Sequence, residues 1–135
     1  MAGPTNKKIL LARPRGFCGG VNRALDIADY ALKLYPPPIY VRHELVHNKH
    51  VVNSLKNQGI VFVEDLDSLT PGSTLIFSAH GVSFQIHEQA QKLGLNIIDA
   101  TCPLVTSVHR QAAQCAREGY AILLIGHQKH VEIQG

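Results

Sequence analysis

Two cysteines in this sequence stand where a thiol could do chemistry. Cys18 lies in a glycine-rich loop, and Cys102 lies directly before Pro103. Both precede segments with helical spacing, where unpaired backbone N–H groups and the helix dipole favour a thiolate. A thiolate is the form that binds a metal or attacks an electrophile. Free cysteine is also among the most buried residues, so a packing role for both cysteines stays open at this point.

Several imidazoles and one carboxylate follow apolar segments in the same manner. They are His43, His47, His80, His127, His130 and Glu132. A histidine ring can donate an N–H to an anion or carry a proton near neutral pH. Glu132 is a candidate proton donor, provided that its surroundings raise its pKa. The other cysteine and three further histidines lie within expected helices, where packing, capping or solvation is expected: Cys115, His50, His87 and His109.

Short apolar runs alternate with amphipathic segments along the chain. Six apolar runs predict strands, at 8–12, 39–41, 60–63, 74–77, 96–98 and 120–125. Four segments with helical spacing predict helices, at 21–34, 48–58, 84–93 and 103–117. Pro103 suits the first turn of the last helix, because proline lacks the N–H that would go unpaired there. The alternation predicts an α/β fold with a mainly parallel sheet and helices on both faces.

Each candidate residue follows one of the predicted strands, and this shared placement is more informative than any local spacing. In open parallel sheets, ligands bind outside the carboxyl ends of the strands, and all of these ends lie on one edge. We therefore expect the thiols, the imidazoles and Glu132 to gather on one rim. No Cys-x-x-Cys or zinc-type spacing is present, and the loop around Cys18 lacks the dinucleotide-binding fingerprint.

The composition limits what else the chain can be. Its 135 residues are the size of one domain, and we expect a flexible leader at 1–7 and a single α/β domain at 8–135. The net charge of +3, without a basic stripe, argues against a nucleic-acid partner. No apolar segment is long enough to cross a bilayer, so no membrane partner is expected. Three widely spaced cysteines favour a reducing, cytoplasmic setting over a disulfide framework.

Five segments of the sequence together resemble one known family. They are Pro14–Val21, Tyr40–Asn48, Phe77–Ser83, Asp99–Thr106 and Ile125–Glu132. They occur in the family's order and cover nearly the whole chain. On these segments the chain is similar to the 4-hydroxy-3-methylbut-2-enyl diphosphate reductases, also called the LytB family. The resemblance implies that the α/β domain is the N-terminal one of the family's repeated domains.

The resemblance also implies a cofactor and a role for each candidate residue. The family holds a 4Fe–4S cluster with three cysteines; Cys18 and Cys102 match the first two, and the third is absent from this chain. Three histidines match residues that hold the diphosphate or hydroxymethyl end of the substrate: His47, His80 and His130. Glu132 matches the acid implicated in protonation.

The reaction that the resemblance implies is a reductive dehydroxylation. It converts 4-hydroxy-3-methylbut-2-enyl diphosphate to isopentenyl and dimethylallyl diphosphates in the non-mevalonate isoprenoid pathway. The implied electron donor is a reduced ferredoxin or flavodoxin.

The sequence departs from the family pattern at three positions and in length. Val131 replaces a usual proline, Gln134 stands where an acid or another residue is expected, and Arg13 replaces a usual asparagine. Because later domains of the family complete the cluster, we expect a domain fragment or truncated gene product that is inactive alone. Two other hypotheses stay open: a non-catalytic α/β remnant, and a small-anion-binding or nucleotide-binding module with structural cysteines.

Overall fold

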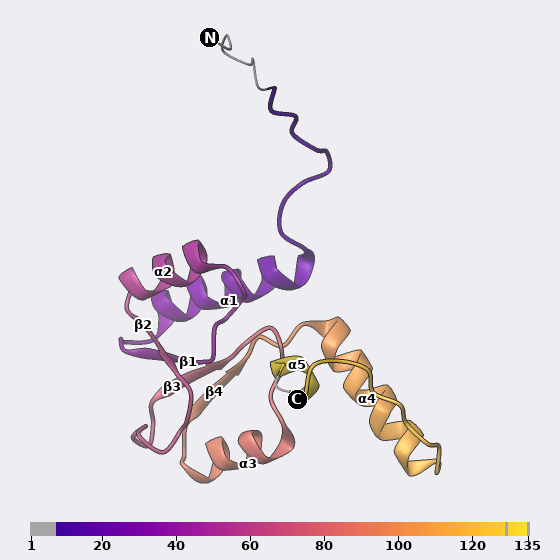
Figure 1. The fold of residues 1–135 in the computed structure, drawn as a ribbon. Helices are drawn as coiled ribbons and strands as arrows, with labels where there is room; N and C mark the ends of the chain where they lie inside the picture. The colour runs from indigo at the N-terminus through magenta and orange to yellow at the C-terminus, as the bar shows by residue number, and fades with distance from the viewer. Residues whose placement is uncertain (1–7, 129, 135) are drawn as a thin grey trace, which may run out of the picture.

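A computed structural model of the chain describes residues 8–128 and 130–134. Its strands are β1 (Ile39–Arg42), β2 (Ile60–Val63), β3 (Thr74–Phe77) and β4 (Asn96–Asp99). The helices in the described part of the chain are α1 (Gly19–Leu34), α2 (Lys49–Asn57), α3 (Phe84–Lys92), α4 (Pro103–Arg117) and α5 (Val131–Gln134). The strands form one parallel sheet in the order β2-β1-β3-β4. The predicted α/β fold is therefore confirmed (Figure 1).

Helices cover both faces of this sheet, as the sequence predicts. α1 and α2 pack on one face and α3 packs on the other (Figure 1). In β3, Ile76 belongs to the core cluster under α1, whereas Leu75 and Phe77 belong to the cluster under α3. Successive side chains of a strand point to opposite faces, so a central strand is buried on both sides. All four residues of β3 are buried, which explains the nearly continuous apolar run in its sequence.

The strands end together at one edge of the sheet. The register pairs Arg42 of β1 with Val63 of β2 and with Phe77 of β3, and it pairs Phe77 with Asp99 of β4. The segments that leave these four positions therefore start from a common rim, as expected for parallel strands.

The helix predictions agree with the structure within two residues at each end. In α1, Ala24, Ala28 and Ala31 recur at helical spacing and are the buried residues of the helix. No periodicity marks α5 in the sequence, because four residues span barely one turn. Among residues 8–128 and 130–134, no helix combines the length and apolar character needed to cross a membrane.

Two of the six predicted strands are wrong. Residues 8–12 and 120–125 are neither helix nor strand. Their large apolar side chains are exposed instead: Ile9, Leu10, Leu11, Tyr120, Ile122, Leu123, Leu124 and Ile125. A strand forms only where a neighbouring strand completes its backbone hydrogen bonds, and neither run has such a neighbour in the described part of the chain. An apolar run predicts the composition of a strand but not its partner.

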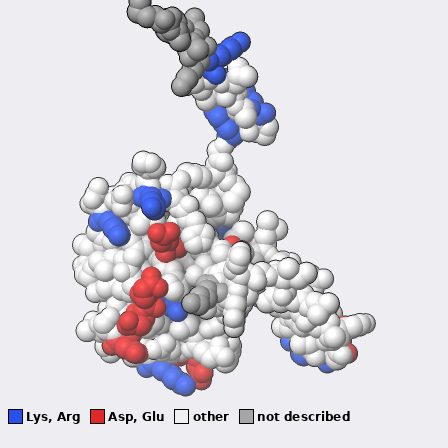
Figure 2. Space-filling view, in the orientation of Figure 1, with Lys and Arg blue, Asp and Glu red and all other residues white. Residues whose placement is uncertain are grey.

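The segment before α1 differs in shape from the central body. The segment that leads into α1 projects from the sheet and carries Lys8, Arg13 and Arg15 (Figure 2). Acidic side chains gather on the visible face of the central body (Figure 2). The predicted leader, 1–7, lies outside the described residues.

Candidate active site at the carboxyl edge of the sheet

The two cysteines that the sequence singles out lie beside each other. Cys18 is the N-cap residue of α1, and Cys102 is the N-cap residue of α4. A Cβ atom added to Gly20 would lie 2.6 Å from the Cys102 sulfur and 3.9 Å from the Cys18 sulfur. The two sulfurs therefore flank the position of this added Cβ atom, and only a glycine leaves that space free. A Cβ atom at Gly16 or Gly19 would meet nothing within 4 Å, so Gly20 is the glycine that this arrangement requires.

Hydrogen bonds between loops hold the two cysteine segments in place. Arg23 Nη1 on α1 donates to the Thr101 carbonyl oxygen at 3.0 Å. The Cys102 N–H donates to the Ala79 carbonyl oxygen at 2.9 Å, and the Ala79 N–H donates to the Leu45 carbonyl oxygen at 3.2 Å. The loops that follow β1, β3 and β4 are thus bonded to one another, and α1 is bonded to the last of them.

Three imidazole rings form a cluster at the same edge. The ring centroids of His47 and His80 are 4.1 Å apart. The His130 ring lies 5.6 Å from His47 and 6.5 Å from His80. The His80 residue is only 6 % exposed, whereas the side chain of His47 is 56 % exposed. The cluster therefore spans from the protein interior to solvent.

The surroundings of the interior ring favour its neutral form. Burial lowers the pKa of His80 below its usual value, and the neighbouring His47 lowers it further. Glu132 opposes this shift by raising the pKa, because a carboxylate favours an imidazolium. Neutral His80 has one N–H to donate. Its Nδ1 lies 3.3 Å from Ser78 Oγ, which orients the ring and leaves Nε2 available for a ligand.

Helix α5 brings the candidate acid into this site. The Glu132 N–H donates to Nδ1 of His130 at 3.3 Å, so Nε2 carries the proton when that ring is neutral. Glu132 lines a cleft of about 450 Å³ together with four other residues that the sequence assigns to a site: Cys18, His47, His80 and Cys102.

Apolar side chains form much of the remaining wall of this cleft. They include Phe17, Val21, Val46, Leu104 and Val105. Ligand sites commonly combine such apolar walls with a few convergent polar groups. Apolar walls also lower the local dielectric constant, so charges inside the cleft interact more strongly than they would in water.

The six residues assigned from the sequence thus meet around the cleft. Five of them line it, and the His130 ring lies beside those of His47 and His80. Their roles stay predictions. His43 and His127 behave differently. His43 Nδ1 lies 2.6 Å from Glu64 Oε2, and His127 is exposed and does not line the cleft. Asn48 lines the cleft and was missed. Its place directly after His47, within the second family-like segment, was the available signal.

The described residues offer an incomplete set of metal ligands. No group of three or more His, Cys, Asp or Glu side chains in residues 8–128 and 130–134 could hold a metal ion. The two thiols, and the space that Gly20 leaves between them, fit two of the cysteine ligands of an iron–sulfur cluster. Cys115 is partly buried and lines another cavity, together with Tyr120 and Leu124, away from the cleft. A cluster here needs further ligands from outside the described residues.

Fold and site together define an α/β protein with thiols, imidazoles and a carboxylic acid at the carboxyl edge of a parallel sheet. A sequence model of the family described as "LytB protein" matches residues 9–135. The chain therefore belongs to the LytB family.

Relatives in this family are closely similar but longer. A 4-hydroxy-3-methylbut-2-enyl diphosphate reductase from Shewanella halifaxensis (strain HAW-EB4) is 57% identical over 127 residues, which cover 94% of this chain and 41% of that protein. The protein of the same name from Mycolicibacterium paratuberculosis (strain ATCC BAA-968 / K-10) is 53% identical over 132 residues, with 98% and 40% covered. The chain spans about two fifths of the length of these relatives.

Solved structures agree with this assignment. The E-1-hydroxy-2-methyl-but-2-enyl-4-diphosphate reductase from Plasmodium falciparum matches with a TM-score of 0.87 and 51% identity, over 90% of this chain and 38% of that one. A structure of (E)-4-hydroxy-3-methyl-but-2-enyl diphosphate reductase, described as the terminal enzyme of the non-mevalonate pathway, matches with a TM-score of 0.81 and 39% identity. That match covers 94% of this chain and 45% of the other.

Proposed function

We propose that this chain supplies the first part of the active site of a 4-hydroxy-3-methylbut-2-enyl diphosphate reductase, an iron–sulfur enzyme of isoprenoid synthesis. The observation that carries the proposal is the meeting of two thiols, two imidazoles and one carboxylic acid at a single cleft. The names of the relatives and of the solved structures support the substrate and the reaction. Because the chain spans about two fifths of the relatives' length, we propose that it does not complete a turnover alone.

The imidazole cluster is the part of the cleft that suits a diphosphate. Imidazole N–H groups donate hydrogen bonds to phosphate oxygens, and these bonds strengthen when the ring is protonated. The His47, His80 and His130 rings lie within 6.5 Å of one another, so one diphosphate group can meet more than one of them. An anion beside His80 would also raise the pKa of that ring and draw a proton into the site.

The thiol pair is the part of the cleft that suits the cofactor. Cys18 and Cys102 are the residues of this chain that would hold a 4Fe–4S cluster, with a further cysteine from outside the described residues. When bound, the cluster would supply electrons and a Lewis-acidic iron for cleavage of the allylic C–O bond. A reduced ferredoxin or flavodoxin in the cytoplasm would deliver those electrons.

Glu132 is the proton donor in this proposal. Dehydroxylation breaks a C–O bond and forms a C–H bond, which consumes two electrons and two protons and releases water. Glu132 gives one proton to the hydroxyl oxygen, which makes water the leaving group. The second proton forms the new C–H bond. The backbone bond from Glu132 to Nδ1 of His130 holds the acid and the diphosphate-binding ring in a fixed relation.

Anaerobic cluster reconstitution tests the thiol assignment, and the chain contains its own control. Cys18→Ser and Cys102→Ser should lose the brown iron–sulfur absorbance, whether the cluster forms in this chain alone or in a protein completed by later family domains. Cys115→Ser should keep the absorbance, because Cys115 lies away from the cleft. If Cys18→Ser and Cys102→Ser hold as much iron and sulfide as a parent protein that does hold a cluster, the assignment is overturned.

Turnover separates the reductase from a non-catalytic remnant. With a chemical reductant and 4-hydroxy-3-methylbut-2-enyl diphosphate, this chain alone should form little or no product. The same chain joined to later domains of a LytB relative should form isopentenyl and dimethylallyl diphosphates. If the completed protein holds a cluster but forms neither product, the chain is a remnant.

A further inference from the structure

Arg42, at the end of β1, has a half-buried side chain with one buried donor that lacks an acceptor. Its Nε atom is buried and has no hydrogen-bond partner. In the part of the chain that the structure describes, no carboxylate lies within ion-pair distance of this guanidinium. Burial lowers its pKa and Glu64 raises it, yet a guanidinium stays protonated in proteins. A buried donor left unsatisfied costs free energy and requires an explanation.

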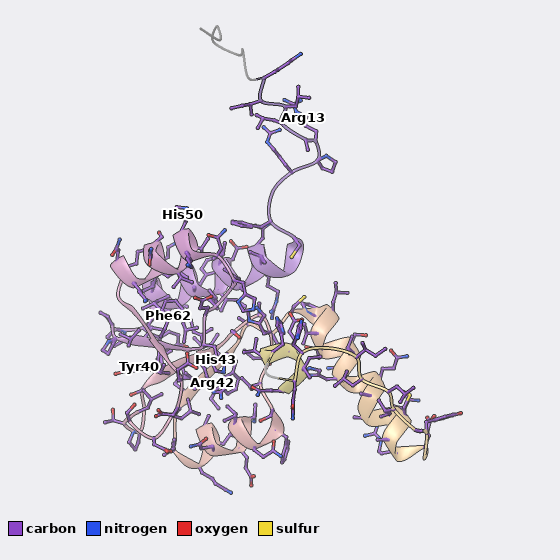
Figure 3. The ribbon with its side chains drawn as sticks, viewed as in Figure 1. Arg13, Tyr40, Arg42, His43, His50 and Phe62 are labelled. Atoms are coloured by element: carbon purple, nitrogen blue, oxygen red, sulfur yellow. The ribbon has the colours of Figure 1, made fainter. Side chains whose placement is uncertain are left out.

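The unpaired guanidinium lies at a cavity of about 410 Å³ that is separate from the cleft of thiols and imidazoles. Arg42 and His43 lie next to each other on the side of the sheet that faces α5 (Figure 3). Helix α5 contributes to both spaces: Glu132 lines the cleft, whereas Val131 and Gln134 line the cavity. An occupant of the cavity would therefore contact the helix that carries the candidate acid.

The start of α3 lines the same cavity. Ser83 is the N-cap residue of α3, but its side chain makes no capping hydrogen bond. Ser83, Gln85 and Ile86, which belong to the first turn and its cap, line the cavity with Arg42. The first N–H groups of a helix have no acceptor inside the helix and attract anions. Arg42 and the start of α3 thus line one space.

The negative charge nearest to Arg42 is directed elsewhere. The Glu64 carboxylate is 79 % exposed, and its Oε2 lies 2.6 Å from His43 Nδ1. Gln134, which also lines the cavity, is neutral. Among the described residues, the lining of the cavity therefore includes the Arg42 cation but no carboxylate.

We propose that this cavity is a second anion site, which binds a phosphate-type oxyanion between Arg42 and the first turn of α3. A guanidinium presents a rigid fork of N–H donors that matches two oxygens of such an anion. The bound anion contacts β1, α3 and α5. Because Glu132 belongs to α5, the anion also holds this residue in position at the cleft. The site does not depend on the proposed reductase reaction.

Nuclear magnetic resonance of the full chain tests this proposal, since arginine Nε–Hε signals report directly on the guanidinium. Inorganic phosphate should shift the Arg42 Nε–Hε signal and the backbone amides of Gln85 and Ile86, with saturation. Sodium chloride at the same ionic strength should not. Glycerol 3-phosphate forms a second arm: tighter binding than inorganic phosphate indicates the phosphate end of an organic ligand, and weaker binding indicates the free ion.

Three variants locate the site. Arg42→Gln should weaken phosphate binding by about tenfold or more, because charge-assisted bonds are lost. Gln134→Glu should weaken it similarly, since a carboxylate in the cavity wall would itself pair with Arg42. Arg110→Gln, an exposed arginine on α4, should bind phosphate as the parent chain does.

The exposed position 134 keeps the test decisive even if Arg42→Gln fails to fold. The proposal is overturned if phosphate shifts the Arg42 signal no more than chloride does. It is also overturned if Gln134→Glu binds phosphate as tightly as the parent, or if the shifts are confined to the imidazole cluster.

Discussion

The central sheet and the segment from α4 to residue 125 both contain apolar side chains at regular spacing, but they bury them very differently. In the sheet, Phe77 and its neighbours are completely buried. By contrast, α4 has no buried residue, and Leu123 and Ile125 are 91% and 94% exposed. The difference lies in whether neighbouring elements pack against the segment, and not in the type of its side chains. A short strand between two others has its backbone bonds and both faces satisfied, whereas an isolated apolar run has neither.

The largest effect expected from this comparison is on stability. Phe77→Ala should lower the free energy of unfolding by about 3–5 kcal/mol, because it removes a fully buried ring from the core under α3. Leu123→Ala, its counterpart in the exposed segment, should change the free energy by no more than about 0.5 kcal/mol. Urea unfolding followed by circular dichroism measures both. Similar losses for the two variants would mean that residues 120–125 are buried in solution.

The same comparison shows which parts of the fold the sequence could predict. The runs at 39–41, 60–63 and 74–77 were recognised because β-branched and apolar residues end at glycine, proline or polar turns, and all three are strands. The runs at 8–12 and 120–125 have the same composition and are not strands. Composition records what a strand would bury, but strand formation also needs a second backbone at hydrogen-bonding distance, and no local pattern reports that.

The next largest effect is expected on metal binding, where α1 meets the start of α4. Gly20 on α1 faces the sulfur of Cys102, where α4 begins. Gly20→Ala should displace that sulfur and weaken the joint binding of a thiophilic ion such as Cd²⁺ by about 10–100-fold, which is typical when the orientation of ligands is lost. The thiolate-to-metal absorbance measures this binding. Gly19→Ala is the matched control, because a Cβ atom there meets nothing within 4 Å. Equal Cd²⁺ affinities in the two variants would show that the two thiols do not bind the ion together.

The candidate site was more predictable than the edges of the sheet. Cys102 and His80 were assigned because each follows an apolar run, and the carboxyl ends of parallel strands share one edge. That rule succeeds for Cys18 as well, although the strand expected before it is absent, because α1 packs on the sheet and starts at the same edge. The cavity at Arg42 could not be predicted, since a missing acceptor is visible only in three dimensions.

A smaller effect on stability should distinguish the N-cap residues of α2 and α3. Asn48 Oδ1 accepts the N–H groups of His50 and Val51 at 3.1 and 3.2 Å, whereas the side chain of Ser83 makes no cap at α3. Asn48→Ala should therefore lower the free energy of unfolding by about 1 kcal/mol, and Ser83→Ala should lower it by much less. Chemical unfolding at one pH decides between them. A loss at Ser83 as large as at Asn48 would show that α3 is capped in solution.

The smallest effect is a pH dependence of stability that arises from the buried His80 ring. Burial and His47 lower the pKa of His80 in the folded chain, whereas in the unfolded chain it has its usual pKa of about 6.5. Below that pH the unfolded state binds the proton more readily, so stability falls as the pH decreases from about 6.5 toward the folded pKa. His80→Asn should make this decline shallower in thermal unfolding between about pH 7 and 5.

The matched control is His127→Asn, which removes a histidine ring that is exposed and does not line the cleft. Addition of millimolar pyrophosphate should act in the opposite direction. An anion bound at the imidazole cluster stabilises protonated His80, so protection against unfolding should grow as the pH falls. If the parent and His80→Asn show equal slopes and equal protection, His80 neither titrates in this range nor meets the anion.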